Sequence, residues 1–244
     1  MQEIADFDLV WRSLPELGQG LVLTIQLTVV TVLCGLLLAV PLGILRASRI
    51  VWASRAIWAY TYFFRGTLML IQLFLIYYGL SEFKAIRASA LWPFLREGYW
   101  CCLLAFTLNT AAYTIEIIAG AIRNVPREDI ETAKAMGMSP WLTMRRITLP
   151  VAFRILLPAY TNEVIFVLQS TSLASLVTVL DLTGVARIII ARTFAPYELF
   201  ITIGLIYLGL TYLMLWGFKR VERRWYRHLG GLPKELAEAD LALR

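Results

Sequence analysis

Histidine and cysteine are scarce in this chain. The only histidine is His228, and the three cysteines are Cys34, Cys101 and Cys102. A zinc site built on a histidine pair is therefore excluded, and we expect neither a metal site nor a disulfide framework, because all three cysteines fall in or beside apolar stretches. No histidine and no pair of aspartates falls inside an apolar stretch, which argues against an enzyme embedded in a membrane.

Three further features are missing. No glycine-rich phosphate loop ending in lysine and serine or threonine occurs, so the chain shows no ATPase motif. No basic stripe alternates with aromatic residues, so the net charge of +6 does not indicate nucleic-acid binding. The first twenty residues carry several acidic side chains, which is the wrong charge for a signal peptide. We therefore expect the first apolar stretch to remain in the mature protein.

Apolar residues dominate the chain instead. Of its 244 residues 59% are hydrophobic, and the mean hydropathy is +0.68, far above that of a soluble domain. Several apolar stretches reach the roughly 20 residues that cross a hydrocarbon core about 30 Å thick. We predict an all-α, polytopic membrane protein with five transmembrane helices. These helices are expected over residues 20–43, 57–79, 100–122, 155–178 and 198–218.

Lysine and arginine are distributed unevenly between these helices. If the N-terminus lies outside, sixteen of them face the cytoplasm: three between the first two helices, six in 123–154 and seven in 219–244. Only six then face outside. Because positively charged loops stay in the cytoplasm, we predict a periplasmic segment 1–19, a membrane domain 20–218 with a cytoplasmic loop 123–154, and a cytoplasmic tail 219–244.

The segment 123–150 is neither apolar enough to span a membrane nor polar enough to be disordered. Pro126 suits the first turn of a short helix that Gly137 would terminate. Ser139 can cap a second helix, which we expect to end near Ile147 because proline disfavours helical geometry in the residue before it. Two short helices joined at a glycine form a rigid knob, which either docks into another protein or lies on the membrane surface.

The same segment carries a family resemblance. The motif Glu131-Thr132-Ala133, followed by Gly137 and by residues 147–150, resembles the signature loop of ABC-importer membrane subunits, with Thr132 in place of the usual alanine. In that family the loop is the coupling helix seated on the ATPase, and here it corresponds to residues 126–150. The resemblance assigns ATPase coupling to Glu131, Thr132, Ala133, Ala135, Met136, Gly137 and Met138.

Further stretches are similar to the polar amino acid subfamily of these importers, and most similar to subunits for histidine, arginine/ornithine and opines. They are residues 64–67, where Leu68 replaces the proline that usually follows, 108–116 and 158–165. The resemblance implies a type I ABC-importer permease fold in the bacterial inner membrane, working by alternating access, with no cofactor of its own. It implies as partners two ATPase subunits that hold ATP and magnesium, a second homologous membrane subunit or a copy of this one, and a periplasmic substrate-binding protein.

Three ionisable residues fall inside the predicted helices at similar depth: Arg65, Glu116 and Glu163. Each needs a partner or a function, because an unpaired charge in a membrane costs at least about 2.5 kcal/mol. We predict that Arg65 pairs with Glu116, which leaves Glu163 facing the translocation path, where a cationic substrate would bind it. Alternatively, Glu163 pairs with Arg65 or with the partner subunit and binds no substrate. Neutral hydrogen bonds to the substrate are expected from Asn109, Asn162, Gln169, Thr171 and Ser172.

The resemblance and these charges together imply a transport subunit and not an enzyme. The expected cargo is a polar, cationic amino acid such as arginine, ornithine, histidine or lysine, or a related opine. The alternative is a secondary transporter driven by an ion gradient. Such transporters commonly contain inverted repeats and broken helices, and from five unlike spans we expect neither.

Overall fold

A computed structural model describes residues 7–48, 50–90 and 92–226, and this part of the chain is helical, without a β-strand. Four helical segments of it are long and apolar enough to cross a membrane, and one bent pair could supply a fifth crossing. The four are α1 (Phe7–Ala47), α7 (Gly98–Arg123), the segment Pro140–Val177 built around α10 (Leu149–Ser170), and α12 (Pro196–Tyr226).

The second predicted span is broken. Helices α2 (Val51–Gly66) and α3 (Met69–Phe74) are bent by 101° at the break between them, so the prediction of one continuous helix over 57–79 is wrong. Thr67 and Leu68 adopt extended backbone at the break. The side-chain amide of Gln72 donates to the carbonyls of Phe64 and Thr67, at 2.8 and 3.2 Å, and so satisfies backbone groups that the break frees.

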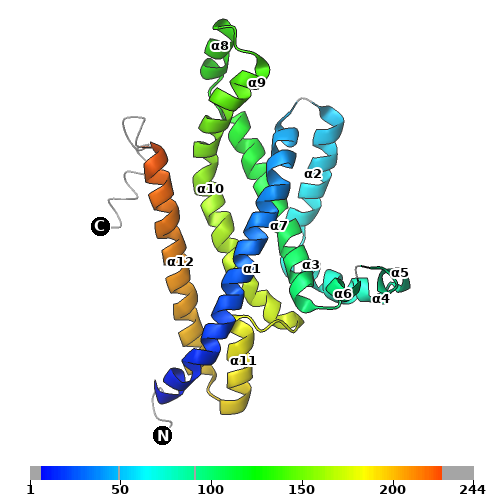
Figure 1. Ribbon diagram of the computed structural model, residues 1–244, viewed down its shortest axis with the longest axis vertical. Helices are drawn as coiled ribbons and strands as arrows, with labels where there is room; N and C mark the ends of the chain where they lie inside the picture. Colours follow the sequence, from blue (N-terminus) through cyan, green and yellow to red (C-terminus); the bar gives the residue numbers. More distant parts are fainter. Residues whose placement is uncertain (1–6, 49, 91, 227–244) are drawn as a thin grey trace.

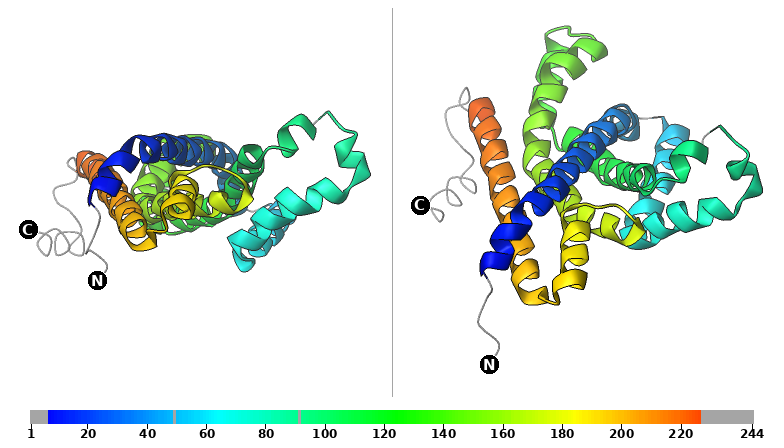
Figure 2. Two further views of the ribbon diagram at one scale, coloured as in Figure 1. Left: turned by 90° about the horizontal axis from the view of Figure 1, so that it is seen from below. Right: turned by 60° about the horizontal axis from the view of Figure 1, so that its bottom comes forward.

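The loop 80–99, between the second and third predicted helices, contains short helices. After α3 the chain passes through the π-helical turn η1 (Leu75–Gly79) into α4 (Leu80–Glu82), α5 (Lys84–Arg87) and α6 (Trp92–Leu95). Both views in Figure 2 show this segment, coloured cyan to green, standing away from the long helices. It returns to the bundle at the start of α7.

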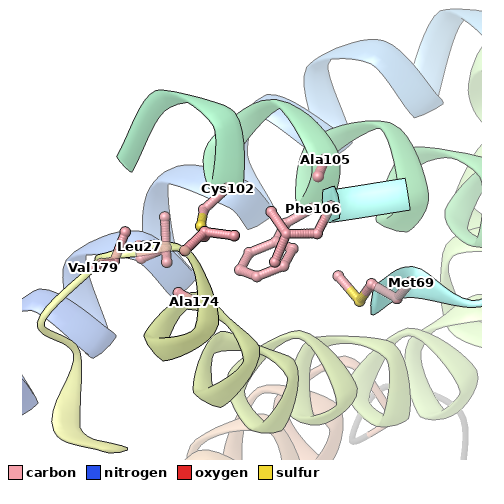
Figure 3. Close-up of a cluster of buried hydrophobic side chains, with 9 residues drawn as sticks. Leu27, Met69, Cys102, Ala105, Phe106, Ala174 and Val179 are labelled. Carbon is pink, nitrogen blue, oxygen red and sulfur yellow. The ribbon is translucent and has the colours of Figure 1, made fainter. Parts of the chain in front are cut away.

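Helix α7 is the central element of the fold. It packs against α1, α2, α3 and α10. Gly35 and Gly43 of α1 allow α1 and α7 to approach closely. A Cβ at Gly35 would lie 2.6 Å from the Thr110 side chain, and a Cβ at Gly43 would lie 2.8 Å from the Ile118 side chain. Figure 3 shows part of the core, where Cys102 and Phe106 of α7 lie fully buried beside Leu27 of α1.

The predicted knob forms two short helices, α8 (Arg127–Ala135) and α9 (Pro140–Thr143). Gly137 follows α8 with a φ of +76°, and the Ser139 hydroxyl accepts a hydrogen bond from the Leu142 N–H at 3.3 Å, as glycine stop and serine cap require. Pro126 precedes α8 instead of lying in its first turn. Figure 1 shows this knob at one end of the molecule, beyond the long helices.

The second helix of the knob does not end near Ile147, as predicted from Pro150. It continues through the π-helical turn η2 (Met144–Thr148) into α10, so that Pro140–Val177 is one helical segment. An α-helix would place a carbonyl against the proline ring and leave a donor missing. Pro150 lies at the second position of α10, just after the π-helical turn, and the helix continues through it.

The last part of α10 tightens into the 3-10 helix η3 (Thr171–Val177), and α11 (Leu182–Thr193) follows before α12. Helix α11 was not predicted from the sequence. The start of α1 lies at the end of the molecule opposite the knob, and α12 ends on the side of the knob (Figure 1). This is the relative arrangement that the charge count requires; which side faces the cytoplasm stays a prediction.

Candidate functional site

Glu163 lies in the middle of α10 and faces α7. Its side chain is buried, with 7% of the residue exposed, and the Thr110 hydroxyl of α7 donates a hydrogen bond of 2.8 Å to its Oε1. No lysine or arginine among the described residues lies within 4.0 Å of this carboxylate. Glu163 therefore does not form an ion pair with Arg65 within this chain. Its carboxylate oxygens can accept more hydrogen bonds than the one from Thr110.

Glu116 has a different partner from the predicted one. Its carboxylate accepts hydrogen bonds from Arg46 Nε at 2.9 Å and from the Thr61 hydroxyl at 2.8 Å, and Arg46 also donates to Ser54 at 2.8 Å. The predicted contact between Arg65 and Glu116 is thus corrected. The first helix was expected to end near residue 43, but α1 continues to Ala47 and brings Arg46 against α7.

The Arg46–Glu116 pair is expected to stabilise the fold. Its two side chains are 14% and 19% exposed, so Glu116→Ala leaves a largely buried guanidinium without its counter-charge and should cost about 3 kcal/mol. The thermal unfolding midpoint of the purified complex measures this loss. Adding Arg46→Met to Glu116→Ala should recover part of it, because the second change removes the uncompensated charge.

The pair Arg192–Glu16 provides the matched control. It spans 3.6 Å and its side chains are 66% and 54% exposed, so Glu16→Ala should cost less than about 1 kcal/mol. Equal losses from the two glutamate replacements would contradict a stabilising role for the buried pair.

Arg65 lies in the last turn of α2, directly before the break. Its guanidinium carbon stands over the Tyr113 ring of α7, 5.1 Å from the ring centre. The Tyr113 ring in turn lies 6.3 Å from the Phe166 ring of α10. Residues three apart share a helix face, so Tyr113 neighbours Thr110 and Phe166 neighbours Glu163. Charged and aromatic groups from three helices therefore gather at one level.

The other predicted binding residues divide into two groups. Asn162 and Gln169 are exposed, and their spacing of seven with Phe166 between them places all three on one stripe of α10. Asn109 and Thr171 are buried and bonded inside the chain. Asn109 donates to the Phe64 carbonyl at 3.3 Å and to Gln72 Oε1 at 3.0 Å, so it holds the break between α2 and α3.

Thr171 and Ser172 bond to their own helix. The Thr171 hydroxyl donates to the Leu168 carbonyl at 2.6 Å, and the half-buried Ser172 donates to the Gln169 carbonyl at 2.7 Å. Sequence reasoning missed Thr110, Tyr113 and Phe166. A signal existed for two of them, because Tyr113 lies three residues before Glu116 and Phe166 lies three residues after Glu163.

The predicted coupling residues lie mostly on the surface of the knob. Met136 is 68% exposed, and Trp141 of α9 is 72% exposed, so the knob presents two large apolar side chains on its surface. Ala133 is buried within the knob and cannot contact another protein. Met138 is half-buried. The remaining predicted coupling residues are exposed: Glu131, Thr132, Ala135 and Gly137.

These groups suit recognition of a charged molecule. The carboxylate of Glu163 accepts hydrogen bonds from a cation, the guanidinium of Arg65 donates them to an anion, and Asn162 and Gln169 offer neutral partners. Within the described residues, no three histidine, cysteine, aspartate or glutamate side chains are arranged to hold a metal ion. The site thus offers binding groups for a polar solute inside a membrane protein.

Comparison with known proteins places the chain. Residues 39–227 match the family described as binding-protein-dependent transport system inner membrane component. The chain is 44% identical over 213 residues to the octopine transport system permease protein OccM of Rhizobium meliloti, covering 87% of each chain. It is 44% identical over 211 residues to the histidine/lysine/arginine/ornithine transport system permease protein HisM of Salmonella typhimurium, covering 86% of this chain and 90% of that one.

A solved structure gives the same answer. The crystal structure of an amino acid ABC transporter with histidines matches with a TM-score of 0.81 at 30% identity, covering 91% of this chain and 99% of that one. The predicted family resemblance and the helical membrane fold are confirmed. The chain therefore belongs to the family of binding-protein-dependent transport system inner membrane components, the membrane permease subunits of ABC importers.

Proposed function

We propose that this chain is the membrane-spanning subunit of an ATP-driven importer that carries cationic amino acids, or related opines, across the bacterial inner membrane. The observation that carries this proposal is Glu163, a buried carboxylate with a hydrogen bond from Thr110 but no cationic contact in the described residues. The names of OccM and HisM support a cargo of this class.

The cargo's cationic side chain binds Glu163. A guanidinium or ammonium group supplies the charge that the carboxylate lacks, in a charge-assisted hydrogen bond that is stronger than a neutral one. The rings of Tyr113 and Phe166 offer faces to a cation, and Asn162 and Gln169 offer neutral hydrogen bonds. An acidic amino acid is rejected, because its side chain would place like charges together in a medium of low dielectric constant.

The knob couples these events to ATP hydrolysis on separate chains. Its exposed residues seat on an ATPase subunit, which holds ATP and magnesium, and Ala133 supports the knob from within. The helical segment Pro140–Val177 is continuous, so a displacement of the knob moves the helix that carries Glu163. Two ATPases, a second membrane subunit or a copy of this chain, and a periplasmic binding protein complete the importer, with the knob cytoplasmic and residues 1–19 periplasmic.

Met136→Asp should weaken binding of the ATPase subunits to this chain by about tenfold or more, because it places a charge at the centre of an apolar contact. The amount of ATPase that co-purifies with the tagged chain measures the effect. Phe83→Asp is the matched control, since Phe83 is similarly exposed but lies in the loop 80–99, away from the knob. Equal recovery of ATPase with both variants would contradict docking through Met136.

A secondary transporter driven by an ion gradient is the alternative to this proposal. The broken pair α2 and α3 supplies one broken helix of the kind not expected from sequence, yet no second pair in the described residues is bent in this way. Inverted repeats call for such breaks in matched positions.

The complex purified through a tag on this chain, reconstituted in liposomes with a binding protein, should take up arginine when ATP is supplied. Uptake should continue after ionophores collapse all ion gradients, and glutamate should not be taken up. Uptake driven by an ion gradient without ATP would overturn the proposed function.

A further inference from the structure

Arg65 is an unused cation beside the candidate site. It is exposed, and no carboxylate of the described residues lies within 4.0 Å of it, because Glu116 is bound by Arg46 instead. Its contact with Tyr113 occupies one face of the guanidinium plane. The N–H groups at the edge of that plane, five donors in a fixed fork, stay available to an anion.

The fold holds Arg65 in this place. Its neighbour Phe64 has a carbonyl that an unbroken helix would use for its own hydrogen bond. Here that carbonyl accepts hydrogen bonds from Gln72 of α3 and Asn109 of α7. The break therefore fixes the end of α2 against α7, and Arg65 is positioned before any ligand arrives. A group fixed in advance loses little entropy when it binds.

Arg65 and Glu163 both adjoin the contact between α7 and α10: Arg65 stands over the Tyr113 ring, and Glu163 accepts a hydrogen bond from Thr110. Thr110 and Tyr113 are three residues apart on α7. Thr110 contacts Glu163 of α10, and Tyr113 contacts Phe166 of α10. The two opposite charges thus flank one small region without being bonded to each other.

We infer that Arg65 binds the α-carboxylate of the substrate while Glu163 binds its cationic side chain. This inference rests on the proposed function and adds the second recognition point. A cationic amino acid carries an α-carboxylate and an α-ammonium at one end and a second cation on its side chain, and the two protein charges are complementary to the carboxylate and to the side-chain cation. The α-carboxylate needs such a partner, because an unpaired anion is costly inside a membrane. The site therefore selects amino acids over the amines that lack the carboxylate.

The test compares arginine with agmatine, which is arginine without its α-carboxylate. The complex is purified through a tag on this chain and placed in lipid nanodiscs without a binding protein, so that the selectivity of a binding protein is not measured. Equilibrium binding of each radiolabelled ligand is recorded for the wild type and for Arg65→Gln. Arg65→Gln should weaken arginine binding by about tenfold to a hundredfold and leave agmatine binding within about twofold.

Two more variants serve as a conservative replacement and as a control. Arg65→Lys retains the charge without the fork, so arginine binding should weaken only severalfold; this variant carries the test if Arg65→Gln cannot be purified. Arg55→Gln removes an exposed arginine from the same helix, ten residues from Arg65, and should change neither ligand.

The outcomes separate this inference from the proposed function. Arg65→Gln that weakens both ligands alike, or neither, overturns the role of Arg65. Glu163→Gln should weaken both, since both carry the guanidinium; if it weakens neither while Arg65→Gln weakens arginine alone, the assignment of Glu163 fails and that of Arg65 stands. A wild-type complex that binds neither ligand would contradict the roles of both Arg65 and Glu163.

Discussion

Glu163→Gln is expected to lower ATP-driven arginine uptake by about 100-fold, which corresponds to about 3 kcal/mol. The replacement is nearly isosteric, and the amide oxygen still accepts the hydrogen bond from Thr110, so the packing of α10 on α7 is retained. Only the negative charge that meets the cargo is lost. Uptake of radiolabelled arginine into proteoliposomes, together with stimulation of ATP hydrolysis by substrate and binding protein, measures the effect.

Glu82→Gln is the control for this experiment. Glu82 is an exposed carboxylate at the end of α4, and its loss should leave uptake unchanged. If Glu163→Gln retains arginine uptake within about twofold of the wild type, Glu163 binds no substrate, and a charge on the partner membrane subunit becomes its proper counterpart.

Gly98→Ala is expected to destabilise the protein by about 3 kcal/mol or more, or to prevent its folding. A Cβ at Gly98 would lie 2.1 Å from the carbonyl oxygen of Val177, far inside contact distance. That oxygen belongs to the backbone at the end of η3, so it cannot rotate away as a side chain would. The yield of folded complex and its thermal unfolding midpoint measure the effect.

Gly120→Ala is the matched control, in the same helix. Nothing lies within 4 Å of a Cβ at Gly120, so alanine should stabilise the helix by up to about 1 kcal/mol. An unfolding midpoint for Gly98→Ala equal to that of Gly120→Ala would show that α7 does not approach η3 so closely.

The close approach at Gly98 is part of a larger feature. Residues 177–182, which connect η3 to α11, run against three glycines: Gly98 of α7, Gly20 of α1 and Gly184 of α11. A Cβ at Gly20 would lie 2.9 Å from the Asp181 carbonyl oxygen, and a Cβ at Gly184 would lie 2.6 Å from the Val179 carbonyl oxygen. Thr178 in this connection has a φ of 67°, a conformation that β-branched residues rarely adopt. The tight packing around the connection holds it in that shape.

The sequence alone was sufficient for the elements that local chemistry decides. Long apolar stretches predicted four of the helices that could span a membrane. The cap at Ser139 and the stop at Gly137 followed from side chains that bond, or backbone that turns, within a few residues. The family could be recognised for the same reason, since its signature loop is a contiguous motif.

Tertiary structure decided the break in the second span, the path through Pro150 and the pairing of the charges. The break depends on Gln72 and on Asn109 of another helix, and no window of sequence around Thr67 contains the second of these. The partner of Glu116 is Arg46, seventy residues away, because α1 continues and packs against α7. Periodicity and composition report the preferences of a segment for its solvent, whereas a hydrogen bond or an ion pair depends on which two helices touch, at what height and in which rotation.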